Sequence, residues 1–71
     1  MQRFFVEPHQ IDEESHQIHI TGSDVNHISN VLRMKTGEEL WISDGSKYEY
    51  RCTIESFEPD EVLLHIVYSQ E

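Results

Sequence analysis

The groups best suited to bind a charged ligand lie in one stretch, Asn26–Gly37. If residues 23–34 form a helix, Asn26, Asn30 and Arg33 follow one another at i, i+4 and i+7 and share one side of it. Amide side chains donate and accept hydrogen bonds, and a guanidinium makes charge-assisted hydrogen bonds to phosphate. This side of the helix is therefore a candidate binding surface for a phosphate-bearing ligand.

Each of these groups also has an ordinary structural role. His27 lies at the border of the apolar side of the helix, where a histidine commonly packs its ring and bonds one nitrogen to the backbone. Arg33 could pair with an acid such as Asp44 instead of a ligand. Trp41 lies on the outward side of its strand, either covered by a partner or available to stack on a base. The sequence leaves both interpretations open.

The remaining reactive residue types form no catalytic constellation. Cys52 falls on the apolar side of a strand, which indicates a small core residue. His16 and His19 are three apart in a strand and so lie on opposite sides, where they cannot share a metal. The three glycines stand singly at turns and form no phosphate-binding loop. We therefore expect no catalytic residue, no metal ligand set and no cofactor site in these 71 residues.

A single helix is predicted over Ser23–Met34. Ser23 or Asp24 is expected to cap its start, and Gly37 to take the left-handed position past its end. At about 100° per residue, the apolar residues of this helix share one arc that must face the core. They are Val25, Ile28, Val31 and Leu32.

Five short stretches separated by turn signals are predicted to be strands, the first because it is rich in aromatic residues and the other four because apolar and polar residues alternate. They are residues 3–6, 15–21, 39–43, 48–55 and 62–68, with residues 11–15 expected to be a loop. The residues expected to face inward are Ile18, Ile20, Leu40, Ile42, Tyr48, Tyr50, Cys52, Ile54, Val62, Leu64, Ile66 and Tyr68. Leu63 and Val67 indicate that the last strand is covered on both sides. Short strands with one inserted α-helix indicate a mainly β fold, a small β-barrel of about five or six strands.

The charge balance argues against a free-standing nucleic-acid binder. Five Lys and Arg residues stand against fourteen Asp and Glu, a net charge of −9, whereas phosphate contacts need clustered cations. The cations all lie in or next to predicted elements, while many acids lie in predicted loops. A chain of this length is one small domain, and it has no apolar run long enough to span a membrane. It also lacks the apolar region of a signal peptide, so a cytoplasmic location is expected.

Four stretches together resemble one known family. They are Arg3–Val6, Val25–Glu39, Asp44-Gly45 and Tyr48–Tyr50. Over essentially its whole length the chain resembles the N-terminal domain of the RsmE family, methyltransferases that modify N3 of a uridine in 16S ribosomal RNA. Many members carry two histidines where this chain has Asn26-His27, so only His27 carries over. Many also have a second glycine where this chain has Ser46-Lys47.

The resemblance implies a PUA-like β-barrel that helps to bind RNA. It also implies a C-terminal SPOUT domain that is knotted, binds S-adenosylmethionine, transfers the methyl group and forms a homodimer. Residues 1–71 are therefore expected to be the PUA-like RNA-binding domain of a longer protein, without the catalytic domain.

On this hypothesis the domain orients 16S ribosomal RNA, or the small ribosomal subunit, for its own C-terminal domain. S-adenosylmethionine is expected to be bound by the parent protein only. The residues expected to contact RNA are Arg3, His27, Asn30, Arg33, Lys35, Lys47 and Arg51. The alternative is a structural module that packs on the catalytic domain or on the second subunit of the parent dimer. Its contacts would be Trp41, Leu63 and Val67.

Overall fold

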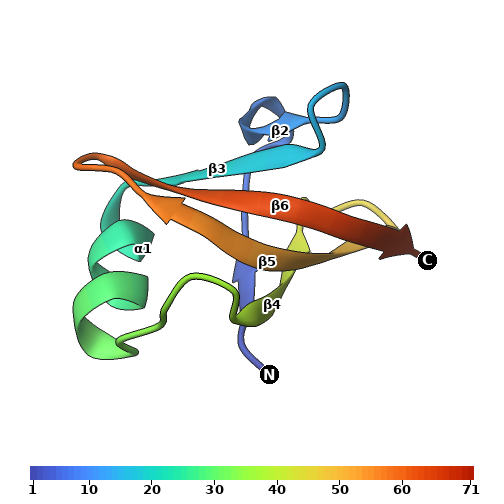
Figure 1. Ribbon diagram of the computed structural model, residues 1–71. Coiled ribbons are helices and arrows are strands. Elements are labelled where there is room, and N and C mark those ends of the chain that lie inside the picture. The colour runs from blue at the N-terminus through green and yellow to red at the C-terminus, as the bar shows by residue number, and fades with distance from the viewer.

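The computed structural model describes all 71 residues and shows a mainly β fold, which confirms the predicted class. Six strands form one sheet in the order β1-β4-β5-β6-β3-β2, curled into a half-barrel with a short helix at one end (Figure 1). The strand β1 runs parallel to β4, and the other neighbouring strands are antiparallel. The strands are β1 Arg3–Phe5, β2 Ile11–Asp12, β3 Gln17–Thr21, β4 Glu39–Ser43, β5 Glu49–Phe57 and β6 Glu61–Gln70.

The inner side of the sheet holds a single core of thirteen buried residues, none of them charged. Alternation along the strands places most of these side chains on one side, as expected for a half-covered sheet. Removing each large aliphatic side chain from water contributes roughly 1.5–3 kcal/mol, so this cluster is the main source of stability. Its members are Phe4, Val6, Ile18, Ile20, Ile28, Leu40, Ile42, Tyr50, Cys52, Ile54, Val62, Leu64 and Ile66.

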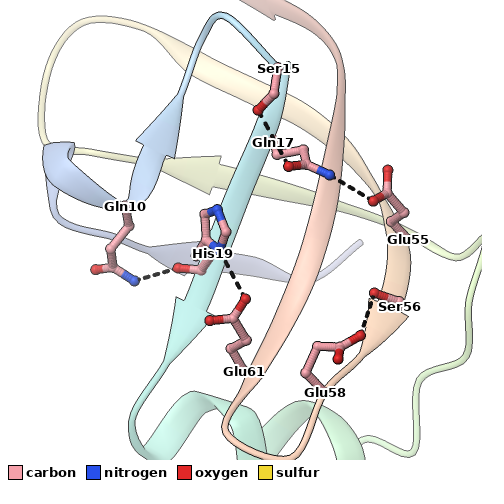
Figure 2. Close-up of polar contacts among 8 residues, drawn as sticks. All are labelled: Gln10, Ser15, Gln17, His19, Glu55, Ser56, Glu58 and Glu61. Carbon is pink, nitrogen blue, oxygen red and sulfur yellow. Dashed lines mark hydrogen bonds and ion pairs between the residues drawn. The ribbon is translucent and has the colours of Figure 1, made fainter.

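Polar contacts fasten β3 to its neighbours (Figure 2). The Gln10 side chain donates a hydrogen bond of 2.7 Å to the backbone carbonyl of His19, and Nδ1 of His19 lies 2.9 Å from Oε1 of Glu61 on β6. The Gln17 amide donates to Glu55 on β5 at 2.8 Å, reaching across β6. The strand β3 is thus held in the sheet by side-chain contacts as well as by backbone hydrogen bonds to its neighbouring strands.

The short strand β2 corrects the prediction of a loop over residues 11–15. Ile11 and Asp12 pair antiparallel with Ile18 and Gln17. Two residues carry no periodic signal, so alternation along the chain could not have detected this strand. None of the helical segments is long and apolar enough to cross a membrane.

The helix starts as α1, Ser23–Asn26, and continues as a π-helical segment, His27–Val31. Its N-cap is Gly22, which has a φ of 74° and provides no side-chain hydrogen bond. The prediction that Ser23 or Asp24 caps the helix is therefore wrong. The chain turns sharply as it leaves β3, and glycine adopts this left-handed backbone without steric cost.

The helix also ends earlier than the predicted Met34. Arg33 takes the left-handed position directly after the helix, with a φ of 52°, while Gly37 adopts its own positive φ of 88° farther on, before β4. The backbone N–H of Met34 then donates to the carbonyl of Ile28 at 3.0 Å, a Schellman-like closure widened by the π turn. The wider turn rotates less per residue, so Val31 leaves the apolar arc and is 60% exposed. Its predicted burial is wrong.

A bulge near the end of β6 reverses the direction of the side chains. Arg51 pairs with Tyr68 while Cys52 pairs with Ile66, so Val67 is an extra residue. Tyr68 therefore points to the outer side, where it is 46% exposed, and its predicted inward position is wrong.

Two further predictions on the sheet are also corrected. Tyr48 precedes β5 instead of lying in it, and it is 40% exposed. On the outer side of β6, Leu63 is partly buried while Val67 is half exposed, so the second side of this strand is only partly covered.

Candidate nucleic-acid interface

The π-helical segment places two of the predicted contact residues at the surface. His27 and Asn30 are both exposed. The ring of His27 lies edge-on to Phe4 with 5.9 Å between centroids, so its apolar surface is partly used for packing. Short π-helical segments are rare and occur frequently at functional sites. This segment therefore both anchors the helix on the core and displays polar groups.

Arg33 and Lys35 follow directly after the helix and are exposed, and neither side chain takes part in an ion pair. The ion pair between Arg33 and Asp44 that the sequence left open does not form. Asp44 instead accepts a hydrogen bond from the backbone N–H of Ser46 at 3.0 Å, and the hydrogen bonds from Ser46 lower the pKa of Asp44. Along the sequence, the acidic residue nearest to Arg33 and Lys35 is Glu38. Its carboxylate accepts a hydrogen bond from the backbone N–H of Lys35.

Arg3 and Arg51 lie elsewhere, on the outer side of the sheet. Nε of Arg3 lies 3.1 Å from a carboxylate oxygen of Glu49, and an N–H of Arg51 donates to Glu39 at 2.8 Å. The hydrogen bond from Arg51 to Glu39 raises the pKa of the guanidinium. Both cations are therefore paired with a carboxylate of another strand, Arg3 with β5 and Arg51 with β4.

The remaining one of the five cations, Lys47, lies in the turn between β4 and β5. Its Nζ is 3.6 Å from a carboxylate oxygen of Glu71 and 5.5 Å from the centre of the Tyr48 ring. Four of the predicted residues thus lie on the helix or directly after it, and the other three lie elsewhere in ion pairs. The four are His27, Asn30, Arg33 and Lys35, and the three are Arg3, Lys47 and Arg51.

Two further residues belong to these surfaces but were absent from the predicted contacts. Asn26 accepts a hydrogen bond of 2.7 Å from the side-chain amide of Asn30, in agreement with their i, i+4 spacing on the helix. Tyr68 packs edge-on to Trp41 with 6.1 Å between ring centroids. No sequence pattern predicts this contact, because it depends on the bulge in β6.

The chemistry that these groups support is binding. No group of three or more His, Cys, Asp or Glu side chains is arranged to hold a metal ion. Burial raises the pKa of the Cys52 thiol to about 12, which keeps it protonated and unreactive at neutral pH. The exposed cations and amides at the helix can hold an anion or a polar ligand.

The curled six-stranded sheet with one short helix at its end is the architecture of a small PUA-like β domain. Residues 20–67 match the RNA methyltransferase PUA domain family. The chain belongs to this family, and the predicted resemblance to the RsmE methyltransferases is confirmed. It is 38% identical over 68 residues to ribosomal RNA small subunit methyltransferase E of Bacillus subtilis (strain 168), covering 94% of this chain and 27% of that protein.

Solved structures show the same fold. A methyltransferase from Legionella pneumophila, solved with bound S-adenosylmethionine, matches 97% of this chain and 28% of its own with a TM-score of 0.80 and 23% identity. A ribosomal RNA small subunit methyltransferase E from Neisseria gonorrhoeae, also bound to S-adenosylmethionine, matches 99% of this chain and 28% of its own, with a TM-score of 0.77 and 20% identity. The chain thus spans little more than a quarter of each relative.

Proposed function

We propose that this chain is an RNA-binding domain that orients 16S ribosomal RNA in an RsmE-type uridine-N3 methyltransferase. The observation that carries the proposal is the state of Arg33 and Lys35. In a chain with a net charge of −9, these two cations are exposed and free of ion pairs at the end of the helix. A free surface cation can contact a phosphate without first separating from a carboxylate.

The proposed contacts differ in kind. Arg33 and Lys35 meet phosphates, while His27 and Asn30 add hydrogen bonds from the adjacent helix. Such contacts fix the position of an RNA backbone without reading its sequence. The predicted contacts at Arg3, Lys47 and Arg51 stay in the proposal as secondary ones, because each of these cations must first leave its carboxylate.

The proposal extends to a longer parent protein. Relatives of about three and a half times the length of this chain include methyltransferases solved with S-adenosylmethionine, which supports a catalytic domain and a cofactor site outside these 71 residues. We place the methyl transfer and the homodimer contacts there, in a cytoplasmic enzyme acting on the small ribosomal subunit. Residues 1–71 then act as the accessory domain.

Binding of a labelled 16S ribosomal RNA fragment to the chain tests the proposal. The Arg33→Ala/Lys35→Ala variant should bind at least about tenfold more weakly than the unmodified chain at low salt, because it loses two phosphate contacts. Both side chains are exposed, so circular dichroism should show an unchanged fold. Equal affinity for the two proteins would contradict the proposal.

A second function, a structural module, is favoured by the outer side of the sheet. Register pairs place Arg3, Trp41, Arg51 and Tyr68 in one row across four strands. Partly exposed tryptophan, tyrosine and arginine side chains are enriched where proteins dock, and the charges of both arginines are already balanced. On this alternative the row packs on the catalytic domain or on the second subunit. Trp41→Ala would then weaken the parent assembly while RNA affinity holds.

A further inference from the structure

A hollow of about 540 Å³ lies between the start of the helix and the turn that joins β5 to β6. In Figure 1 this turn passes beside α1, at the end of the sheet opposite the C-terminus. One wall is helical and the other belongs to the turn. The residues that matter for its chemistry are Val25, Asn26 and Asn30 on the helix, and Glu58, Pro59 and Asp60 on the turn.

The helical wall presents a hydrogen-bond donor beside an acceptor. The amide of Asn30 donates to the side-chain oxygen of Asn26 at 2.7 Å, and neither side chain bonds any other residue. The amide nitrogen of Asn26 and the amide oxygen of Asn30 are therefore free. If both amides were turned over, the pair would still offer one free donor and one free acceptor. The pair therefore offers one free donor and one free acceptor in either orientation of its amides.

The opposite wall offers acceptors only. Glu58 accepts a hydrogen bond from the hydroxyl of Ser56 at 3.1 Å (Figure 2), and Asp60 has no hydrogen-bond or ion-pair partner. Two carboxylates at the rim repel a phosphate, so a ligand must enter through a part that carries N–H groups and no negative charge. Pro59 and Val25 add apolar surface on which a flat ring can rest.

We propose that this hollow binds one unpaired nucleobase with an exocyclic amino group, adenine or cytosine, in preference to uracil. In both bases an amino group stands beside a ring nitrogen that accepts, which complements the free donor and acceptor of the Asn26–Asn30 pair. The second amino hydrogen is then available to a carboxylate of the turn. Uracil has no such hydrogen and turns a carbonyl oxygen toward the acids. This inference rests on the proposed RNA-binding function and adds base selection to it.

Nuclear magnetic resonance on the 71-residue chain provides the test, because Asn26 and Asn30 are its only asparagines and their side-chain amide signals report on the hollow directly. The ligands are the nucleosides adenosine, cytidine and uridine, which carry no phosphate. Adenosine and cytidine should shift these signals with an affinity about tenfold higher than that of uridine, the order expected for one well-formed base contact. N-acetyl-arginine amide serves as a cationic competitor.

Two variants and one control variant sharpen the result. Asn30→Ala removes half of the amide pair and should abolish the preference for adenosine and cytidine, as followed on the backbone signals of Gly22 and Asp60. Asp60→Asn supplies a donor that uracil can use, so it should narrow the preference. Val31→Ala, an exposed change on the same helix, should leave the preference unchanged.

Equal shifts with all three nucleosides, or a preference that survives Asn30→Ala, would overturn this inference. So would binding of the acetyl-arginine amide in place of the nucleosides, which would assign the hollow to a basic protein segment. These outcomes do not depend on Arg33 or Lys35. A chain that binds the RNA fragment through those cations but shows no nucleoside preference keeps the proposed function and loses only the base site.

Discussion

Cζ of Arg51 lies 5.3 Å from the ring centre of Trp41, its direct neighbour across the ladder between β4 and β5. The guanidinium is thus held between the indole and the carboxylate of Glu39, while Tyr68 packs against the edge of the indole. The outer side of the sheet is therefore ordered by internal contacts. Arg33, in contrast, has no ion-pair partner, and this difference separates the two groups of cations.

The aromatic contact predicts a measurable coupling. Trp41→Ala removes a partly buried ring together with its contacts to Arg51 and Tyr68, so the free energy of unfolding should fall by about 2 kcal/mol. Urea unfolding measures this change. In a double-mutant cycle, Trp41→Ala and Tyr68→Ala should couple by about 0.5–1.5 kcal/mol. Phe5→Ala, at a more exposed aromatic, is the control and should couple with neither; strict additivity of Trp41 and Tyr68 would refute the contact.

Arg33→Gly should increase stability. Arg33 has a φ of 52°, a conformation that costs a residue with a side chain about 1 kcal/mol and costs glycine nothing. We therefore expect the free energy of unfolding to rise by up to about 1 kcal/mol, measured by thermal or urea unfolding. Arg33→Ala keeps the unfavourable conformation and should give no such gain. A less stable Arg33→Gly variant would show that the arginine side chain supports the fold.

The same variant separates folding from binding. If Arg33 contacts phosphate, Arg33→Gly should weaken RNA binding even though the domain becomes more stable. A loss of affinity could then not be attributed to partial unfolding.

Alternation and turn signals were sufficient to predict the fold class and most of the core. The inward positions of Ile18, Ile20, Leu40 and Ile42 follow from period-two patterns, and all four are fully buried. The predicted inward position of Tyr68 was wrong because one extra residue in β6 reverses the side of every side chain after it. No local pattern marks such a bulge, since both phases of this strand are rich in apolar residues.

The candidate site was predictable only in part. The helical spacing of Asn26, Asn30 and Arg33 is a local property, and the structure keeps these residues on or directly after one helix. The neutralisation of Arg3 by Glu49 is not local, because the two residues are 46 positions apart and meet only through the sheet. The sequence could therefore list the cations but could not separate the free ones from the paired ones.

Alkaline pH should destabilise the domain, because the buried thiol of Cys52 and the buried phenol of Tyr50 resist losing their protons. Burial raises the pKa of Cys52 from its ordinary 9.0 to about 12, and burial with the charges of Asp44 and Glu13 raises the pKa of Tyr50. Above pH 9 the unfolded chain loses these protons first, so stability present below pH 9 is lost as the pH rises toward 12. Urea unfolding between pH 7 and 11 measures the decline.

The cysteine itself offers the control for that measurement. Cys52→Ala should show a smaller decline from its own stability at pH 7, since one of the two groups is gone. The native thiol should also react with a thiol reagent only at the rate of unfolding. Rapid labelling of the folded protein at pH 8 would contradict the buried, protonated state.

The salt dependence of RNA binding tests the central claim most directly. Each phosphate contact adds close to one unit to the slope of log affinity against log salt, so Arg33→Ala/Lys35→Ala should lower that slope by about two. Arg3→Ala/Lys47→Ala removes the same charge from ion-paired cations and should change the slope far less. Equal slopes for the unmodified chain and the Arg33→Ala/Lys35→Ala variant would contradict an RNA contact at the end of the helix.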